Sequence, residues 1–421
     1  MPPSCSDANV EAILEPVSGV SSGHATVHDA VSASSSGDTV WVCPGSHDLS
    51  LEGGTLSLVH TLRLEGVADP TAAVLDLNGS GTVIDVASSQ VGVEIVNLVV
   101  TGSTDDRGVT LGLGSSLTVQ TSEISENGGG GLSVGSGASA MVESSTIRDN
   151  DVPEGNGGGA DVYWGELTLA DSVVSGNTVS GYPPAYGSGG GVAVSHGTLT
   201  VTNSTISGNT AIDGAGGGIR AYASELSVGS GSVITDNNAH FGGGGIYADY
   251  AEPVTIADST ITSNTSVSGS GGGIAIAGQY GPVSITNCTV SGNQAMYGGG
   301  IHTFYAYDSY ATYVLDCTLT GNNATIAGGG IGVGYGASVA VEGNATTGVD
   351  STSTVTGNGA PDGGGASVDD AGSLQSIDSD WGSVAEANDN VPPDVYVIPA
   401  DSTHVYDDVS NFTCDDTGCA P

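Results

Sequence analysis

The feature that most constrains the fold of this chain is a motif that recurs nine times. Each copy has an aliphatic residue, an asparagine three positions later, a short gap and then three consecutive glycines. The triplets lie at residues 129–131, 157–159, 189–191, 216–218, 243–245, 271–273, 298–300, 328–330 and 363–365. The asparagines are Asn127, Asn150, Asn177, Asn209, Asn237, Asn264, Asn293, Asn322 and Asn358. A period of about 28 residues indicates one structural unit stacked on the next.

Two further positions repeat in register with the asparagines. The aliphatic residues are Ile124, Ile147, Val174, Ile206, Ile234, Ile261, Val290, Leu319 and Val355. Five positions before each asparagine stands a small residue: Ser122, Ser145, Ser172, Ser204, Ser232, Ser259, Cys288, Cys317 or Ser353. A register kept over nine copies rules out chance similarity and makes the repeat the basis of the fold prediction.

The residues after each glycine triplet alternate between aliphatic and variable. Ile219 and Ala221 flank Arg220, for example, which is typical of a strand with one buried face. Segments such as "TLTV" and "STI" supply two more short strands in each repeat. We therefore predict an all-β solenoid with three short parallel strands in each rung. At ~4.8 Å a rung, nine rungs make a rod roughly 40 Å long.

The glycines, asparagines and serines are expected at the corners between strands. Glycine adopts positive φ and allows adjacent rungs to approach closely. We expect the asparagines to share this backbone conformation and to form an amide ladder, and the stacked serine hydroxyls to pair with each other. A phosphate-binding loop is excluded because the triplets occur nine times, with no following lysine and no helix for the loop to open.

Charge limits the partners of this surface. The 421 residues include 46 acidic residues against four arginines and no lysine, and the net charge is -42. Because such a surface repels phosphates and anionic lipid heads, we expect neither nucleic acid nor membrane as a partner. No run of 18 apolar residues occurs, so we expect no membrane insertion.

The asparagine and glycine units resemble the repeats of chlamydial polymorphic outer membrane proteins and related right-handed parallel β-helix proteins of the pectin-lyase-like superfamily. The resemblance covers residues 90–370 and extends to the N-terminal segment "ATVHDAVSASSSGDTVWVCPGSH". It implies a right-handed solenoid. The chlamydial pattern also includes a C-terminal membrane barrel, which has no counterpart in this sequence, so a surface-translocator role is not implied.

Both ends of the solenoid are expected to carry caps. Residues 1–50 are predicted to hold a short helix begun by a Thr26–Asp29 capping box, with "GDTVWVCPG" as the first strand. Residues 51–372 form the solenoid, and residues 373–421 form an acidic C-terminal capping segment. These boundaries define the predicted domains.

The six cysteines indicate an oxidising compartment. Cys5 and Cys43 lie in the N-terminal cap and are a candidate pair, and Cys414 and Cys419 are expected to pin the C-terminal cap. Cys288 and Cys317 stack in neighbouring rungs, either as a disulfide or as two packed thiols. The segment "MPPSCSDANV" lacks the pattern of a signal peptide, so we expect a mature or otherwise exported form, extracellular or at the cell surface.

Aromatic residues indicate the candidate binding face. Thirteen of the 15 tyrosines fall between Tyr163 and Tyr335. The alternation points several aromatic and polar side chains outward from one strand position in successive rungs, with Tyr250, Tyr305 and Tyr335 at the neighbouring corner. Flat rings beside hydrogen-bonding groups suit the apolar faces of sugars. The candidate ligand-binding residues are Tyr163, Trp164, Arg220, Tyr222, Tyr247, Asp249 and Phe304.

Other chemistry has weaker support. No catalytic residue is assigned, although Asp105, Asp106, Asp161 and Asp249 are the carboxylates that a polysaccharide hydrolase would use. Calcium is the candidate metal for the C-terminal acidic cluster, with no other cofactor expected. That cluster consists of Asp378, Asp380, Asp389, Asp394, Asp407, Asp408, Asp415 and Asp416. The eight histidines are scattered along the sequence, and no metal cluster is predicted among them.

These observations predict a secreted or cell-surface protein, structural or adhesive, that binds glycan or protein along an aromatic face. The first alternative is a carbohydrate-active enzyme, hydrolase or lyase, acting on neutral or cationic polysaccharide. The second is a surface-layer or filament component that self-associates end to end or laterally.

Overall fold

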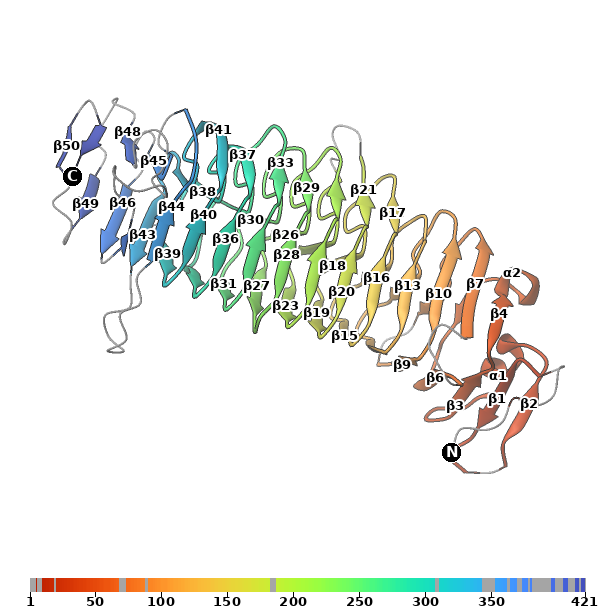
Figure 1. The fold of residues 1–421 in the computed structure, drawn as a ribbon. Coiled ribbons are helices and arrows are strands. Elements are labelled where there is room, and N and C mark those ends of the chain that lie inside the picture. The colour runs from red at the N-terminus through yellow and green to blue at the C-terminus, as the bar shows by residue number, and fades with distance from the viewer. Residues whose placement is uncertain are drawn as a thin grey trace.

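The computed structural model describes residues 5, 10–18, 20–67, 73–87, 90–181, 187–306, 310–342, 353–361, 364–368 and 373–377. Beyond residue 375 it describes backbone alone, in the strand segments 376–377, 379–380, 395–397, 404–407, 413–415 and 418–420. The chain forms a single rod-shaped solenoid of stacked parallel strands. Figure 1 shows the N-terminus at one end of this rod and the C-terminus at the other.

Four parallel sheets run along the rod. Sheet A comprises β2 (Ser22–His24), β1 (Ala12–Glu15), β3 (Thr39–Val42), β6 (Leu62–Gly66), β9 (Gly92–Val96), β12 (Ser116–Gln120), β15 (Ser139–Glu143), β19 (Glu166–Ala170), β23 (Thr198–Thr202), β27 (Glu225–Gly229), β31 (Val254–Ala257), β35 (Val283–Thr286), β39 (Thr312–Leu315), β43 (Ser338–Glu342), β46 (Ser373–Ile377) and β49 (His404–Asp407). Sheet B comprises β4 (Gly45–Asp48), β7 (Ala73–Gly79), β10 (Val99–Ser103), β13 (Glu123–Ser125), β16 (Thr146–Arg148), β20 (Val173–Ser175), β24 (Thr205–Ser207), β28 (Val233–Thr235), β32 (Thr260–Thr262), β36 (Thr289–Ser291), β40 (Thr318–Thr320), β44 (Ser353–Thr356) and β47 (Ser379–Asp380).

The other two sheets complete each turn. Sheet C comprises β5 (Leu56–Ser57), β8 (Ile84–Val86), β11 (Val109–Leu111), β14 (Leu132–Val134), β18 (Ala160–Tyr163), β22 (Val192–Ser195), β26 (Ile219–Tyr222), β30 (Ile246–Asp249), β34 (Ile274–Ala277), β38 (Ile301–Phe304), β42 (Ile331–Val333), β45 (Ala366–Val368) and β48 (Val395–Val397). Sheet D comprises β17 (Asp151–Val152), β21 (Thr178–Val179), β25 (Thr210–Ala211), β29 (Asn238–Ala239), β33 (Thr265–Ser266), β37 (Gln294–Tyr297) and β41 (Asn323–Ala327).

A typical rung follows the order C, A, B, D before it enters the next rung. The prediction of three strands in each rung is correct for sheets A, B and C. Sheet D was not expected. It forms because the residues after the seven ladder asparagines from Asn150 to Asn322 are extended and bond to the equivalent residues of the next rung, as Thr210 and Ala211 do with Asn238 and Ala239. The middle rungs therefore have four sides.

The N-terminal cap is partly as predicted. Helix α1 (Val27–Ala33) begins where the Thr26 hydroxyl accepts a hydrogen bond from the Asp29 N–H at 3.0 Å. A second short helix, α2 (Leu49–Glu52), follows β4. The segment "GDTVWVCPG" forms β3, which is the first parallel strand of sheet A but not the first strand of the chain. Strands β1 and β2 precede it, and their antiparallel pairing covers the edge that β3 would otherwise expose.

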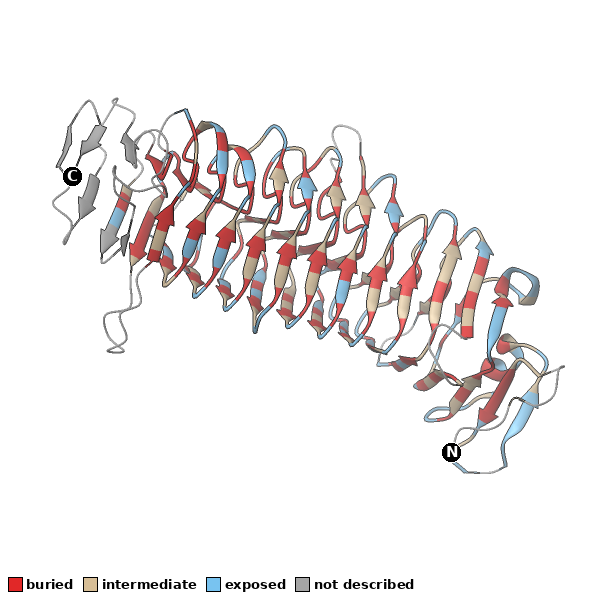
Figure 2. Cartoon of the chain, in the orientation of Figure 1, coloured by how far each residue is buried: buried red, intermediate tan, exposed pale blue. Residues whose placement is uncertain are grey.

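The alternating pattern sets the core. In β26 and β30 the first and third residues are buried and the second and fourth are partly exposed. Figure 2 shows the same alternation along the rod. These inward side chains join one continuous hydrophobic core. A separate small core lies beside sheet D and consists of Val152, Val179, Ala211 and Ala239.

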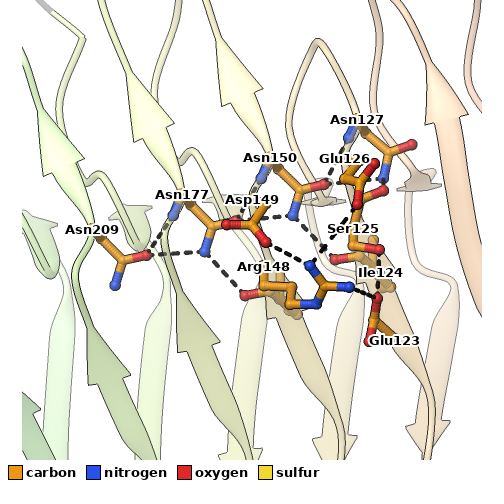
Figure 3. A network of polar contacts seen from close by, with 11 residues as sticks. Glu123, Ile124, Ser125, Glu126, Asn127, Arg148, Asp149, Asn150, Asn177 and Asn209 are labelled. Atoms are coloured by element: carbon orange, nitrogen blue, oxygen red, sulfur yellow. Dashed lines mark hydrogen bonds and ion pairs between the residues drawn. The ribbon is translucent and has the colours of Figure 1, made fainter.

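The repeated asparagines form the predicted amide ladder. The Nδ2 of each donates to the Oδ1 of the asparagine in the next rung at 2.9–3.0 Å, from Asn127 to Asn358. The backbone N–H donates to the same oxygen, and Nδ2 also donates to a backbone carbonyl of the preceding rung, as Asn237 does to Ile206. Figure 3 shows the first four asparagines beside the Arg148 ion pair with Glu123. All of these asparagines are buried.

The prediction that these asparagines adopt positive φ is wrong. The residue immediately before each one does so instead, with φ between 53° and 66° at Glu126, Asp149, Gly176, Gly208, Asp236, Ser263, Gly292, Gly321 and Gly357. A sharp turn at that residue aims the asparagine inward, where its amide can reach the next rung. The asparagine itself needs no strained backbone.

The glycine triplets pack against the ladder. A Cβ on Gly245 would lie 2.7 Å from the Gly273 carbonyl oxygen and 3.1 Å from the Asn264 amide. Gly243, the first of the same triplet, has φ 57°. The triplets therefore combine a close approach between rungs with a left-handed turn, as the sequence predicted.

The serine column differs from its prediction. The hydroxyls do not pair with each other. Most donate to a backbone carbonyl two or three residues earlier, and several also accept the backbone N–H of the preceding rung's serine, as the Ser172 Oγ does with Ala170 O at 2.7 Å and Ser145 N at 3.2 Å. Backbone groups at this corner lack partners within their own strand, so the hydroxyl satisfies them.

Cys288 and Cys317 take serine positions in this column as two buried, unbonded thiols. The Cys288 N–H donates to the Cys317 Sγ at 3.3 Å. The contact with Cys288, together with burial, raises the pKa of the Cys317 thiol. Of the two alternatives that the sequence left open, a disulfide or two packed thiols, the structure has the packed thiols. The Cys317 sulfur accepts the backbone hydrogen bond that a serine hydroxyl accepts elsewhere in this column.

Cys5 and Cys43 form the predicted disulfide. At the other end, the backbone of Cys414 lies opposite Cys419 in the pair of β50 (Thr413–Asp415) and β51 (Gly418–Ala420), and their side chains lie outside the described residues. The same is true of most of the predicted capping segment 373–421. Among the described helices, none has the length and apolar character needed to cross a bilayer.

Candidate functional site

A groove of about 960 Å³ runs along the corner where the strands of sheet C lead into those of sheet A. Its lining comes from successive rungs because the same corner position recurs in each. The lining residues are Gly137, Ala138, Ser139, Trp164, Gly165, Glu166, His196, Gly197, Thr198, Tyr222, Ala223, Ser224, Glu225, Tyr250, Glu252 and Tyr280.

Five rings follow one another along this groove. Trp164 stacks on His196 with ring centroids 4.6 Å apart and planes 15° apart. His196 meets Tyr222 edge to face at 5.5 Å, and Tyr222 meets Tyr250 in the same way at 5.9 Å. Tyr250 then stacks on Tyr280 at 5.5 Å. Rings in five successive rungs span roughly 19 Å at the spacing of parallel strands.

Three of these rings belong to residues with positive φ. Trp164, His196 and Tyr250 have φ of 54°, 55° and 53°. The sharp turn at this corner projects the side chain away from the core, and the ring of the next rung then supports it. The three rings are therefore accessible to solvent to different degrees: Trp164 is 53% exposed, and His196 and Tyr250 are partly exposed.

Carboxylates line the sheet A side of the groove. Glu166 and Glu225 are the first residues of β19 and β27, and both lie opposite Thr198 of β23 in the parallel register. Glu252 lies in the next rung. All three glutamates are exposed. The groove thus combines flat apolar rings with acceptors of hydrogen bonds, and its charge favours neutral or cationic ligands over anionic ones.

The structure brings three of the seven predicted site residues to this groove. Trp164 and Tyr222 line it. Tyr163, 58% exposed, meets the Trp164 and His196 rings edge to face at 6.5 and 6.4 Å.

Three others lie on the neighbouring face of sheet C. Arg220 and Tyr222 stand opposite Tyr247 and Asp249 in the parallel register of β26 and β30. The Arg220 guanidinium lies 5.1 Å from the centre of the Tyr222 ring. Burial raises the pKa of Asp249, with Arg220 acting in the opposite direction, and burial together with Asp249 raises the pKa of Tyr247 to about 12. Arg220 therefore connects this face to the groove through Tyr222.

Phe304 lies beyond the groove, two rungs past Tyr250 along sheet C. It contacts His302 and Tyr305, at 5.1 and 5.6 Å. Tyr335 then contacts Tyr305 at 6.2 Å. These residues form a second aromatic cluster that is not part of the groove lining.

The candidate hydrolytic aspartates are distributed over separate places. Asp105 accepts hydrogen bonds from the Ser80 hydroxyl and the Gly81 N–H, which lower its pKa, so it stabilises a turn. Asp161 lies 3.7 Å from Arg107, and burial raises the pKa of this carboxyl while Arg107 lowers it. No pair of them shares the groove.

Sequence reasoning missed His196, Tyr280 and the three glutamates. The sequence does contain a pattern that predicts the aromatic corner. Trp164, His196 and Tyr250 each stand five residues after the last glycine of a triplet, in nearby rungs. The glutamates follow that position by two residues. Their scatter across rungs hides them unless the repeats are aligned first.

Possible metal ligands occur near both ends of the sequence. The acidic C-terminal cluster proposed for calcium lies outside the residues whose side chains are described. In the N-terminal cap, however, Glu11, His47 and Glu52 bring three ligand atoms within 4.8 Å of one another. The sequence predicted no metal cluster among the histidines, and the group found here contains one histidine, His47, which the fold brings close to two glutamates distant in sequence.

Comparison with known proteins supports the fold. A family model described as the right-handed β-helix region matches residues 78–239 and 185–358. No curated protein matches the sequence. Among solved structures, the chain is similar to tailspike protein 3 of bacteriophage CBA120, with 12% identity and a TM-score of 0.45. That alignment covers 91% of this chain and 56% of the tailspike, so this chain spans little more than half the tailspike's length.

These comparisons do not support the finer resemblance to the chlamydial repeats. The two matched segments together reach from residue 78 to residue 358 and include eight glycine triplets and all nine ladder asparagines. The family model thus matches the same region in which the rungs stack in register. The chain belongs to the right-handed β-helix family.

Proposed function

We propose that this chain is a secreted or cell-surface protein that binds a polysaccharide chain along the aromatic groove. The observation that carries the proposal is the row of five rings, joined by four ring contacts, that runs from Trp164 to Tyr280 along one groove. Rings at the spacing of successive rungs offer stacking platforms to consecutive sugar units. The Cys5–Cys43 disulfide supports an oxidising, extracellular location.

The groove's charge narrows the ligand class. Glu166, Glu225 and Glu252 accept hydrogen bonds from hydroxyls or ammonium groups and repel carboxylates and sulfates. With a net charge of -42, the surface around the groove adds to this repulsion. Neutral or amine-bearing polysaccharides are therefore the proposed ligands, and uronic-acid polymers are not.

A glycan array carrying neutral, amine-bearing and anionic polysaccharides tests this proposal. Trp164→Ala and Tyr250→Ala should each weaken binding roughly tenfold, which corresponds to about 1.4 kcal/mol. Tyr313→Ala is the matched control, since Tyr313 is 42% exposed on β39 and does not line the groove. Binding that is unchanged in both groove variants would refute the site.

The earlier candidate face is tested in the same series. Tyr222→Ala should weaken binding like the other groove variants, whereas Tyr247→Ala and Phe304→Ala should have smaller effects because neither lines the groove. Equal losses for Phe304 and Trp164 would instead favour an extended flat face over a groove.

A hydrolase is the second candidate, on one observation. Glu166 and Glu225 are two rungs apart on the same side of the groove, which places their backbones roughly 9.6 Å apart. This is close to the carboxylate separation of inverting glycosidases. Glu166→Gln and Glu225→Gln would then each abolish cleavage even at polysaccharide concentrations that saturate the groove, and an unchanged chain length after prolonged incubation with the wild type would refute the enzyme.

A further inference from the structure

The N-terminal cap contains a group of polar side chains that the groove does not involve. Glu11 precedes β1, His47 lies in β4 and Glu52 ends α2, so three separate elements converge at this point. One ligand atom of each lies within 4.8 Å of the other two. His47 is 5% exposed and the Glu52 side chain 6% exposed, whereas that of Glu11 is 44% exposed. The group is therefore closed on one side and open on the other.

Hydrogen bonding fixes the proton on the His47 ring. The Nε2 atom lies 2.7 Å from the Cys43 carbonyl oxygen. A carbonyl only accepts, so Nε2 carries the hydrogen. The other ring nitrogen, Nδ1, faces the Glu11 carboxylate, whose Oε2 lies 3.3 Å away. This contact requires a positive charge, supplied either by a proton on Nδ1 or by a metal ion between Nδ1 and Oε2.

The second carboxylate determines which positive charge fits. The Glu52 side chain is 6% exposed, so water does little to offset the charge of its carboxylate. A proton on His47 would balance one carboxylate, and a second proton, on the His28 ring, would be needed to balance the other, whereas one divalent cation balances both. Arg63, the one arginine in the first 100 residues, is already paired with Glu65 and Glu94. Among the described residues of this part of the chain, no permanently charged side chain therefore serves this purpose.

Neighbouring groups orient the ligands as in known metal sites. The Cys43 carbonyl, next to the Cys5–Cys43 disulfide, holds the His47 ring. The His28 N–H donates to the Glu52 Oε2 at 3.2 Å, and the His28 ring lies 3.4 Å from the same oxygen. Such outer contacts fix the tautomer and direction of metal-binding side chains.

We propose that Glu11, His47 and Glu52 form a binding site for one zinc-like divalent cation. One imidazole nitrogen and two carboxylates suit zinc, whereas calcium prefers six to eight oxygens. The exposed side of Glu11 leaves room for water as a further ligand. The cation would link β1, β4 and α2 and so hold the cap against the first rungs of the solenoid.

Titration of the full chain with ZnCl₂, followed by calorimetry, tests this site. Excess Mg²⁺ in the buffer occupies the oxygen-only sites that a strongly acidic surface offers. We expect one equivalent of Zn²⁺ to bind, and His47→Gln and Glu11→Gln each to weaken that binding roughly tenfold or more. Glu15→Gln and His24→Gln are the controls, because they remove one carboxylate and one imidazole from the same cap outside the site.

The design stays decisive if one variant does not fold. His47 is buried, so its replacement carries that risk, but the Glu11 side chain is largely accessible and its amide is nearly the same size. Zn²⁺ should also raise the melting temperature of the wild type and leave that of Glu11→Gln unchanged. Wild-type affinity equal to that of Glu11→Gln, or no Zn²⁺ binding above the Mg²⁺ background, would overturn the proposal and leave a simple histidine–carboxylate ion pair.

Discussion

Two corners of the same rungs follow opposite rules. At the corner between sheets B and D, the inward residue is asparagine in all nine copies. At the corner between sheets C and A, the residue with positive φ changes from rung to rung. It is Gly137, Trp164, His196, Ala223, Tyr250, Gly278, Tyr305 or Gly336.

The difference lies in what the neighbouring rung requires. Each ladder asparagine is buried and must satisfy donors and acceptors above and below it, so a change in one copy disturbs two others. The side chain at the other corner points to solvent and does not have to satisfy hydrogen-bonding groups of the neighbouring rungs. The corner that keeps the same residue in every rung is thus the one that stabilises the solenoid. The corner at which the residue changes from rung to rung is the one that can take on a binding role.

The variable corner also carries a cost. A side chain other than glycine at positive φ costs roughly 1–2 kcal/mol, and glycine would avoid it. Gly137, Gly278 and Gly336 show that this corner accepts glycine. The presence of Trp164, His196 and Tyr250 in the rungs between is therefore consistent with selection for something other than stability.

The strongest test of this comparison is Asn237→Ala. The Oδ1 of Asn237 accepts hydrogen bonds from the Asn209 N–H and Nδ2, both at 3.0 Å, and its own Nδ2 donates to the Ile206 carbonyl and the Asn264 Oδ1. Alanine leaves the Asn209 N–H and one of the two Nδ2 hydrogens buried without an acceptor, while the other Nδ2 hydrogen keeps its bond to the Val174 carbonyl. Because each such group costs ~1–3 kcal/mol, the free energy of unfolding should fall by about 3–5 kcal/mol.

The matched control is Asn238→Ala, one residue along the chain. Asn238 is exposed in β29, and its backbone N–H bond to the Asn209 carbonyl survives the change. We expect it to alter stability by less than about 0.5 kcal/mol in the same denaturant titration. Similar losses for the two asparagines would show that the ladder is not what distinguishes the uniform corner.

The sequence was sufficient for the uniform part of the molecule. Period, alternation and the positions of asparagine and glycine predicted parallel rungs, the amide ladder and the inward residues such as Ile219 and Ala221, because every copy repeats the same constraint. The details that failed were local. Positive φ lies at Asp236 and not at Asn237, since which residue turns depends on where the side chain must point.

The groove was predictable only in part. Trp164 and Tyr222 were found because aromatic side chains after a glycine triplet are conspicuous. Glu225 was not, because an exposed glutamate at a strand start looks like any solvated acid until the rungs are superposed. The Glu11, His47 and Glu52 group was beyond sequence reasoning, since only the packing of β1, β4 and α2 brings these residues together.

His302 lies within β38, on the aromatic side of the molecule, and tests whether burial changes the behaviour of a residue on that side. It lies on the aromatic side, but Tyr297 and Phe304 cover it, and its Nδ1 is buried without a partner among the described residues. Burial lowers its pKa to about 4 from the ordinary 6.5. Below pH 6.5 the unfolded chain binds a proton that the folded chain does not, so stability should fall as the pH drops towards 4. The full loss is about 3 kcal/mol.

The measurement compares denaturation of the wild type and His302→Phe at pH 7 and pH 4.5. Phenylalanine keeps a ring between Tyr297 and Phe304 and does not titrate. The carboxylates contribute equally to both proteins, so the variant should lose about 2 kcal/mol less than the wild type over this interval. Parallel pH profiles would mean that His302 is hydrated and belongs with the exposed residues of the groove.

The smallest expected effect isolates the backbone at the variable corner. Ala223 has φ 47° and lines the groove between the rings of His196 and Tyr250 without a ring of its own. Replacing it with glycine removes the left-handed strain, although glycine loses more freedom on folding. The difference should stabilise the protein by about 0.5 kcal/mol and leave glycan binding unchanged, measured by denaturant titration and by the same array. If Ala223→Gly destabilises the chain instead, the corner is not strained, and the aromatic residues at neighbouring rungs need no functional explanation for their φ.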